Sequence, residues 1–192
     1  MKKIIISIVV CSLCVSCAKN PFSTRESEPP TARAGTFIPP TTPQIVLENL
    51  RLSYSELVIG NYTQCLDSSL VFKFDFIQGA QLDTSWGVAR EISLTEKMFN
   101  DFTIARSTRS LRVNFTAKAS QPDVISDTTA TLVRDYTVTV LDSASATIDS
   151  YQGIATFTLI ESSFNFWRIV VWEDLHLNTQ TRSWAELKNA YR

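Results

Sequence analysis

The chain has 192 residues, 44% of them hydrophobic, and its 18 basic and 19 acidic side chains leave a formal net charge of −1. This length and hydrophobic content suit one folded domain with a substantial core. Because no block of basic residues occurs in the sequence, the composition argues against a nucleic-acid partner and against a polybasic contact with a membrane.

The first seventeen residues contain two lysines, an almost unbroken apolar run from Ile4 to Val15, and then Ser16 and Cys17. The run is too short for a membrane span, which takes about twenty apolar residues, and is typical of a secretory signal peptide. Its ending resembles the lipobox of bacterial lipoproteins, in which the leader is removed before a cysteine that then carries the lipid. The resemblance implies a signal peptide at 1–16, lipidation of Cys17, for example with palmitate, and membrane anchoring in the bacterial cell envelope. By the same resemblance, Ala18 and Lys19 imply the outer rather than the inner membrane.

Six of the seven prolines lie between residues 18 and 43, among serine, threonine, glutamate and arginine. Such a segment cannot bury enough apolar area to offset its ordering entropy. We therefore expect the lipidated cysteine and a disordered, proline-rich tether at 17–42, and the folded domain at 43–192. In polyproline geometry the tether could hold the domain up to roughly 80 Å from the lipid.

The four cysteines do not predict a disulfide. Cys11 and Cys14 leave with the leader and Cys17 is acylated, so Cys65 remains alone. It shares the apolar phase of a short helical stretch, and we interpret it as a small buried hydrophobe rather than a reactive thiol.

Helical spacing dominates the first part of the domain. Thr42 and Pro43 form a good helix start, and the apolar stripe that follows predicts a helix to Leu57. A second short helix is expected after Gly60. The residues 70–76 then alternate between one aromatic face and polar positions, which predicts a strand, and a capping box at 93–96 predicts the start of a third helix.

The remainder predicts an antiparallel sheet. Alternating residues at 111–118 and 130–141, and further strands at 151–160 and 164–172, are separated by turns near Pro122 and within 142–149. The strand at 164–172 is apolar in both phases, as expected of a central strand covered on each side. A capping box at 183–186 predicts a terminal helical turn.

The expected order of elements is two helices, a strand, a helix and four long strands. This order resembles that of the nuclear transport factor 2-like superfamily, which also contains the SnoaL-like cyclases and ketosteroid isomerase. The resemblance is carried by the opening helix 43–57, the join between residues 62–66 and 72–74, and the closing segment 166–174. It implies an α+β fold in which a strongly bent antiparallel sheet wraps around N-terminal helices to form a cone with a pocket. The superfamily has no local catalytic motif that could be mapped onto this chain, so the fold alone licenses no reaction.

Polar residues in apolar strand phase are the candidates for the lining of this pocket, because a buried charge needs a partner. Arg134 interrupts the apolar face between Leu132 and Tyr136, and Arg168 shares its phase with Trp172. The two arginines could clamp a carboxylate ligand. Alternatively they form structural ion pairs with Asp75, Asp135, Glu173 or Asp174, or lie at a solvated edge of the sheet.

His176 follows a strand at a place where a general base could lie, but a surface or supporting role is the alternative. It is the only histidine, so no metal cluster is expected, and no cofactor motif occurs. The candidate pocket residues are therefore Arg134, Tyr136, Arg168, Trp172 and His176. The four tryptophans could stack on a ring-shaped ligand or simply form core.

The leading hypothesis is a lipid-anchored envelope protein, not an enzyme, whose cone binds a small molecule or another envelope protein. The alternative is a cyclase or isomerase acting on a hydrophobic substrate, for which Tyr54, Tyr62, Asp75, Arg134 and His176 would have to meet in one cavity. A homodimer through the exposed face of the sheet is a third expectation, taken from the resemblance.

Overall fold

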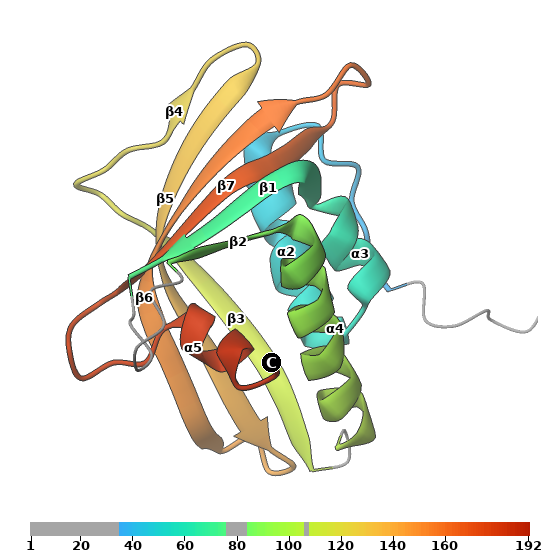
Figure 1. Ribbon diagram of the computed structural model, residues 1–192, viewed down its shortest axis with the longest axis vertical. Helices are drawn as coiled ribbons and strands as arrows, with labels where there is room; N and C mark the ends of the chain where they lie inside the picture. Colours follow the sequence, from blue (N-terminus) through green and yellow to red (C-terminus); the bar gives the residue numbers. More distant parts are fainter. Residues whose placement is uncertain (1–34, 76–83, 106–107) are drawn as a thin grey trace, which may run out of the picture. The chain divides into compact units, whose positions relative to one another are not determined.

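A strongly bent sheet curls around the helices of the domain, which gather on its concave side (Figure 1). The computed structural model describes residues 35–75, 84–105 and 108–192. The expected fold class, α+β with a bent sheet wrapped around N-terminal helices, is confirmed. The signal peptide at 1–16, Cys17, most of the tether and Phe76 lie outside the described residues.

Three helices and a short edge hairpin come from the first half of the domain. Helices α2 (Pro43–Glu56) and α3 (Ile59–Gln64) precede β1 (Leu66–Phe74) and β2 (Ser85–Gly87), and α4 (Val88–Ile104) follows. Both early helices and the aromatic face of β1 were predicted. Pro43 occupies the first helical position as expected, although the Thr42 side chain makes no capping hydrogen bond.

The second half supplies the long strands. These are β3 (Arg109–Ala117), β5 (Thr129–Asp142), β6 (Thr147–Glu161) and β7 (Trp167–His176), with the short β4 (Val124–Ile125) paired to β5. The chain ends in α5 (Trp184–Asn189), whose predicted capping box between Ser183 and Glu186 is present. In the described part the sheet has seven strands, and six of them follow the order β2-β1-β7-β6-β5-β3.

Four predictions about these elements were wrong. Ser93 does not begin a helix but lies inside α4, which starts five residues earlier at Val88 and is preceded by Gly87. The sheet is not purely antiparallel, because β1 and β7 run parallel. Strand β7 starts at Trp167 rather than Phe164 because residues 162–166 form a turn, and although β7 is central, its alternate side chains are partly exposed rather than covered.

The core lies between the concave face of the sheet and the helices. Alternation places one side of each long strand inward, so that Phe72, Val138, Phe157 and Trp172 are all fully buried. Helices α2 and α4 add apolar stripes to the same core. No helix within the described ranges is long and apolar enough to cross a bilayer.

Candidate functional site

Aromatic rings of the chain itself fill the interior of the cone. Trp184 from α5 lies edge-on to Tyr54 and to Trp172, with ring centroids 5.0 and 4.7 Å apart, and its Nε1 donates a hydrogen bond of 2.8 Å to the Tyr54 hydroxyl. Phe157 packs 5.0 Å from Trp172. All four side chains are fully buried. The space where a cone-shaped fold could hold a ligand is therefore occupied by side chains from α2, β6, β7 and α5.

Helix α5 is fastened into this interior by groups from two strands. Asp174 accepts hydrogen bonds from the Tyr136 hydroxyl, at 2.5 Å, and from the backbone N–H of Ala185, at 2.6 Å. The Tyr136 hydroxyl in turn accepts a hydrogen bond from the N–H of Trp184, at 2.8 Å. These contacts satisfy N–H groups of the first turn of the helix, which have no partner within the helix itself.

A glycine makes this contact between strands possible. Gly153 of β6 pairs with Tyr136 on one side and with His176 on the other. A Cβ atom at Gly153 would lie 2.5 Å from the Tyr136 hydroxyl and 2.3 Å from the carbonyl oxygen of Leu175. The absent side chain leaves room for Tyr136 to reach Asp174. Burial raises the pKa of Asp174 to about 6, even though the hydrogen bonds from Tyr136 and Ala185 act in the opposite direction.

A buried ion pair joins α4 to α5. The carboxylate of Glu91 contacts Lys188 Nζ and the Tyr62 hydroxyl, and it accepts a hydrogen bond of 2.6 Å from Trp86 Nε1. Both charged side chains have no exposed surface. Burial lowers the pKa of Lys188, and the neighbouring carboxylate of Glu91 opposes that shift.

Aromatic rings surround the ammonium group of Lys188. Its Nζ lies 3.9 Å from the ring centroid of Trp172, 4.3 Å from that of Phe72 and 5.4 Å from that of Trp184. Desolvated cation–π contacts of this kind are favourable and partly replace lost water. The ammonium group of Lys188 therefore occupies the place between these rings where a cationic ligand could otherwise bind.

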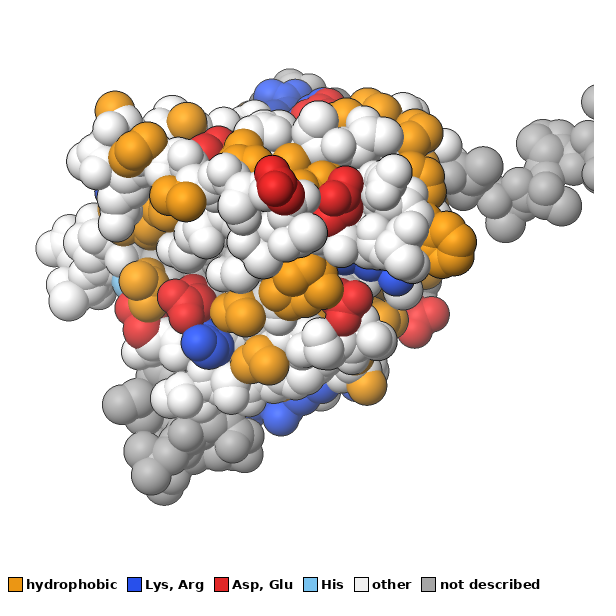
Figure 2. Space-filling view, turned by 90° about the horizontal axis from the view of Figure 1, so that it is seen from above, with side chains coloured by type: hydrophobic (Ala, Val, Ile, Leu, Met, Phe, Trp, Pro, Cys, Tyr) orange, Lys and Arg blue, Asp and Glu red, His pale blue; other side chains and the backbone are white. Residues whose placement is uncertain are grey.

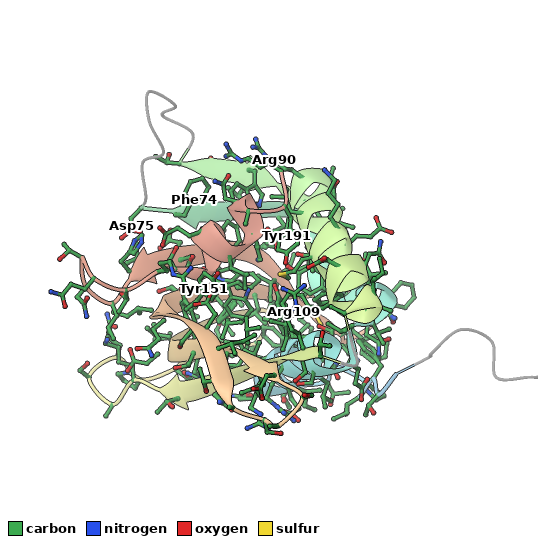
Figure 3. The ribbon with its side chains drawn as sticks, turned by 90° about the horizontal axis from the view of Figure 1, so that it is seen from below. Phe74, Asp75, Arg90, Arg109, Tyr151 and Tyr191 are labelled. Atoms are coloured by element: carbon green, nitrogen blue, oxygen red, sulfur yellow. The ribbon has the colours of Figure 1, made fainter. Side chains whose placement is uncertain are left out.

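His176 lies at the end of β7, between two carboxylates. Its Nδ1 is 2.6 Å from Asp75 Oδ1 and its Nε2 is 3.0 Å from Glu186 Oε2, so it links β1, β7 and α5. Burial alone would lower the pKa of His176, but the hydrogen bonds with Asp75 and Glu186 outweigh burial and raise it. Figure 3 looks onto this side of the domain and shows Asp75 at the end of its strand, away from Tyr151 and Tyr191.

Arg134 forms a structural ion pair. Its guanidinium binds both carboxylate oxygens of Asp123, at 2.5 and 2.7 Å, and lowers the pKa of that carboxyl. The ion-pair alternative therefore describes Arg134, but its partner is none of the four acids expected from the sequence. One of those acids, Asp135, instead pairs with Lys118. Arg134 borders an open surface hollow of about 190 Å³ together with Leu47 and Phe115.

Arg168 has a different environment. Its side chain is exposed, and no ion pair joins it to any residue in the described part of the chain. It lies between two hollows, one of about 220 Å³ and one of about 380 Å³. Besides Arg168, both hollows share Gln64; the first has Phe37, Pro39, Pro40 and Phe166, and the second has Thr63, Leu66, Asp67, Ser68, Val88 and Ile92.

The residues required for an enzyme do not meet in one place. Tyr54 and Tyr62 lie in the dry interior with rings 5.8 Å apart, Asp75 and His176 lie together at the end of the sheet, and Arg134 is bound to Asp123. Of the five candidate pocket residues, Trp172 is core, Tyr136 supports α5, and Arg134 and Arg168 border separate hollows. Within residues 35–75, 84–105 and 108–192, no group of three or more metal-binding side chains occurs.

Sequence reasoning missed the pair Glu91 and Lys188. Glu91 shares the helical phase of Leu94, Met98 and Phe102, and that spacing was the signal that could have placed it inward. The misplaced helix start at Ser93 hid this signal, because it left Glu91 outside the predicted helix.

No family model matches the sequence, and no curated protein matches it significantly. Among solved structures, a conserved protein from Planctomyces limnophilus superposes with a TM-score of 0.53 at 14% identity, over 69% of this chain and 91% of its own. Rv3472 from Mycobacterium tuberculosis, described as of unknown function, has a TM-score of 0.50 at 17% identity, over 68% and 66%. A nuclear transport factor 2-like protein of unknown function from Shewanella oneidensis has a TM-score of 0.49 at 14% identity, over 68% and 93%. At such identities the likeness concerns the fold alone.

The buried ion pair yields a stability prediction. Lys188→Met should lower the free energy of unfolding by about 3–5 kcal/mol, because it leaves the Glu91 carboxylate buried without its cation. Adding Glu91→Gln should recover a large part of that loss, since the neutral amide needs no counter-charge. Urea unfolding of the single and double variants measures both effects. Equal losses in Lys188→Met and in the double variant would show that packing, and not charge, holds α5.

The link at His176 predicts a dependence of stability on pH. Because the folded state raises the pKa of His176, its contribution is complete below the ordinary value of 6.5 and is lost as the pH rises through the folded-state pKa. His176→Gln should therefore flatten the decline of unfolding free energy as the pH rises above about 6.5. The difference should stay under about 1 kcal/mol, since the pair is partly exposed.

Denaturant titrations at half-unit pH steps check this expectation. Asp174, with a pKa raised to about 6, loses its own contribution mainly between about pH 4 and pH 6, below the window used for His176. Parallel curves for the two proteins above pH 6.5 would contradict the prediction.

Proposed function

We propose that this chain is a lipid-anchored protein of the bacterial cell envelope that acts by binding through the outer surface of its cone-shaped domain. The observation that carries the binding half of the proposal is the filled interior, where Trp172, Trp184 and Lys188 are completely buried. A ligand pocket is usually a concave space of several hundred Å³ that is largely formed in advance. The interior offers the chain's own side chains instead, so the surface hollows are the better candidates.

The anchoring half of the proposal rests on the sequence before the domain. The apolar run from Ile4 to Val15 followed by Ser16 and Cys17 supports removal of a leader and lipidation of Cys17. Ala18 and Lys19 support the outer membrane as the destination. No nucleic-acid partner is proposed, because the sequence contains no basic block.

The hollows beside Arg168 support an apolar ligand that carries a carboxylate. The guanidinium is free of ion pairs with the described residues and is flanked by the apolar side chains of Phe37, Phe166 and Leu66. The nearby Asp67 accepts hydrogen bonds from the N–H and the hydroxyl of Ser69, which lower the pKa of its carboxyl, and the charge of Arg168 lowers that pKa further without forming an ion pair. A guanidinium on an apolar wall binds a carboxylate at two points while the body of the ligand covers the wall.

An enzyme of the cyclase or isomerase kind is the second candidate. It is favoured by the convergence of Tyr62, Glu91 and Lys188, three titratable groups in contact in an apolar setting. However, a substrate could reach them only if α5 left the interior, and that would expose Trp184 and break the bonds to Asp174. We therefore place this candidate second.

The lipid anchor has a direct test. A bacterium expressing the full chain and fed radioactive palmitate should label the protein, and Cys17→Ser should abolish the label and move the protein out of the detergent phase. Cys65→Ser is the matched control and should keep the label, because that thiol is buried in the domain. Persistent labelling of Cys17→Ser would refute the anchor.

The surface site is tested with octanoate as a carboxylate probe on the unlipidated chain from Cys17 onward. Titration calorimetry should show binding, and Arg168→Gln should weaken it about tenfold, the loss of roughly one charge-assisted hydrogen-bonded pair. Arg112→Gln, which removes another exposed arginine on β3, should leave the affinity unchanged. Equal weakening by both variants, or equal binding of octanol, would argue against a carboxylate site at Arg168.

A further inference from the structure

Half of the large hydrophobic side chains that are clearly exposed in the described residues lie at one end of the domain. They are Ile38, Val124, Ile125, Phe164 and Phe166, and together they define what we call the apolar end. Three distant segments of the chain contribute them: the entry segment before α2, β4, and the turn between β6 and β7.

Backbone contacts hold these three segments together. Ile125 pairs with Ala130 at the start of β5, and the N–H of Glu161 at the end of β6 donates to the carbonyl of Thr128. The N–H of Trp167 donates to the carbonyl of Pro40 in the entry segment. Figure 1 shows β4, the β6–β7 turn and the start of α2 at the same end of the domain. Figure 2 looks onto that end and shows hydrophobic side chains among uncharged polar surface and scattered acidic and basic side chains.

The most prominent member of the apolar end stands on a hydrogen-bonded turn. Phe164 is 80% exposed, the largest aromatic exposure at this end. Its turn is closed by hydrogen bonds between Ser162 and Phe166 and between Asn165 and Ser162, and Asn165 adopts a positive φ of 58°. A protruding phenylalanine exposes apolar surface to water and is suited to insertion into an apolar phase.

Most basic groups at this end are paired. Arg134 is neutralised by Asp123 and Lys118 by Asp135, while Asp127 adds an exposed acidic group and Arg168, beside Phe166, adds a single exposed cation. A polybasic contact with acidic lipids is therefore absent from the described residues of this end. Contact here would depend on apolar burial and would need no anionic headgroup.

The first described residues lead to the apolar end along α2: Thr36 binds Glu56 at the end of that helix, Ile38 binds Asn49 further back, and α2 starts at the apolar end. The segment from Cys17 to Thr36 can extend at most about 63–68 Å. An acyl group on Cys17 would thus keep the apolar end within reach of the bilayer. We infer that the apolar end rests on the lipid surface to which the chain is anchored, with Phe164 inserted into the boundary between headgroups and acyl chains. The inference takes its setting from the proposed anchor.

The four native tryptophans permit a sharp test, because all of them are buried. A tryptophan introduced by Phe164→Trp would be the exposed one at the apolar end. Ile148→Trp is the matched control, because Ile148 is 54% exposed near the turn between β5 and β6 and so lies at the opposite end of the sheet.

The test does not depend on lipidation in the cell. The unlipidated chain from Cys17 onward contains every described element, and in it Cys65 is buried, so Cys17 can be coupled to a maleimide phospholipid in vesicles of neutral phosphatidylcholine. Replacing that lipid by its brominated form should at least halve the additional emission of Phe164→Trp. The emission of Ile148→Trp should change no more than that of the parent chain, and added salt should alter neither result.

Equal quenching of the two variants, or none at Phe164→Trp, would overturn the inference. Emission from Phe164→Trp that depends on protein concentration and not on bromine would overturn it as well, in favour of a second copy at this end. The palmitate experiment judges the anchor separately, so the failure of one proposal cannot be mistaken for failure of the other.

Discussion

The contact between Glu91 and Lys188 closes the cone, and the rest of the interior depends on it. One carboxylate meets the ammonium of α5, the hydroxyl of Tyr62 on α3 and the indole N–H of Trp86 on β2, so it ties three elements to α4. A buried charge without its partner is strongly destabilising, and both groups have no exposed surface. Any opening of the interior would therefore separate these charges and uncover Trp184. Helix α5 belongs to the core and is not a lid over an empty pocket.

Because side chains fill the interior, both proposed binding surfaces lie on the outside of the domain. The hollows beside Arg168 and the apolar end share Phe166, so the two proposed surfaces adjoin each other. Under the proposed anchoring, the hollow would then open near the lipid surface, where amphiphilic carboxylates concentrate. The two features would act together on such a ligand. Arg168 would bind its carboxylate, and Phe164, inserted into the lipid surface, would hold the hollow close to the membrane from which the ligand comes.

Much of the fold could be predicted because burial in strands follows alternation, and alternation is written directly in the sequence. The inward positions of β1 and β5, including Phe72 and Val138, are examples. The start of α4 could not be placed in the same way, because the local capping pattern at Ser93 competed with a packing preference that extends the helix to Val88. The parallel pairing of β1 with β7 joins residues about a hundred positions apart, and no local pattern encodes it.

The two arginines show why candidate sites are harder to predict than strands. Arg134 lies on the buried face of β5 and is paired with Asp123, whereas Arg168 does not share the phase of Trp172 as expected but lies on the exposed side of β7, between Trp167 and Ile169. Strand β4 folds back on β5, with Val124 opposite Thr131, and so brings Asp123 beside Arg134. Arg168 precedes Ile169, which lies opposite Leu66 of the parallel neighbour β1. The pKa of Asp67 on that strand is lowered mainly by hydrogen bonds from Ser69, and to a smaller extent by the charge of Arg168. Whether an arginine in a strand is paired therefore depends on the carboxylates that sheet topology brings beside it, and not on sequence spacing.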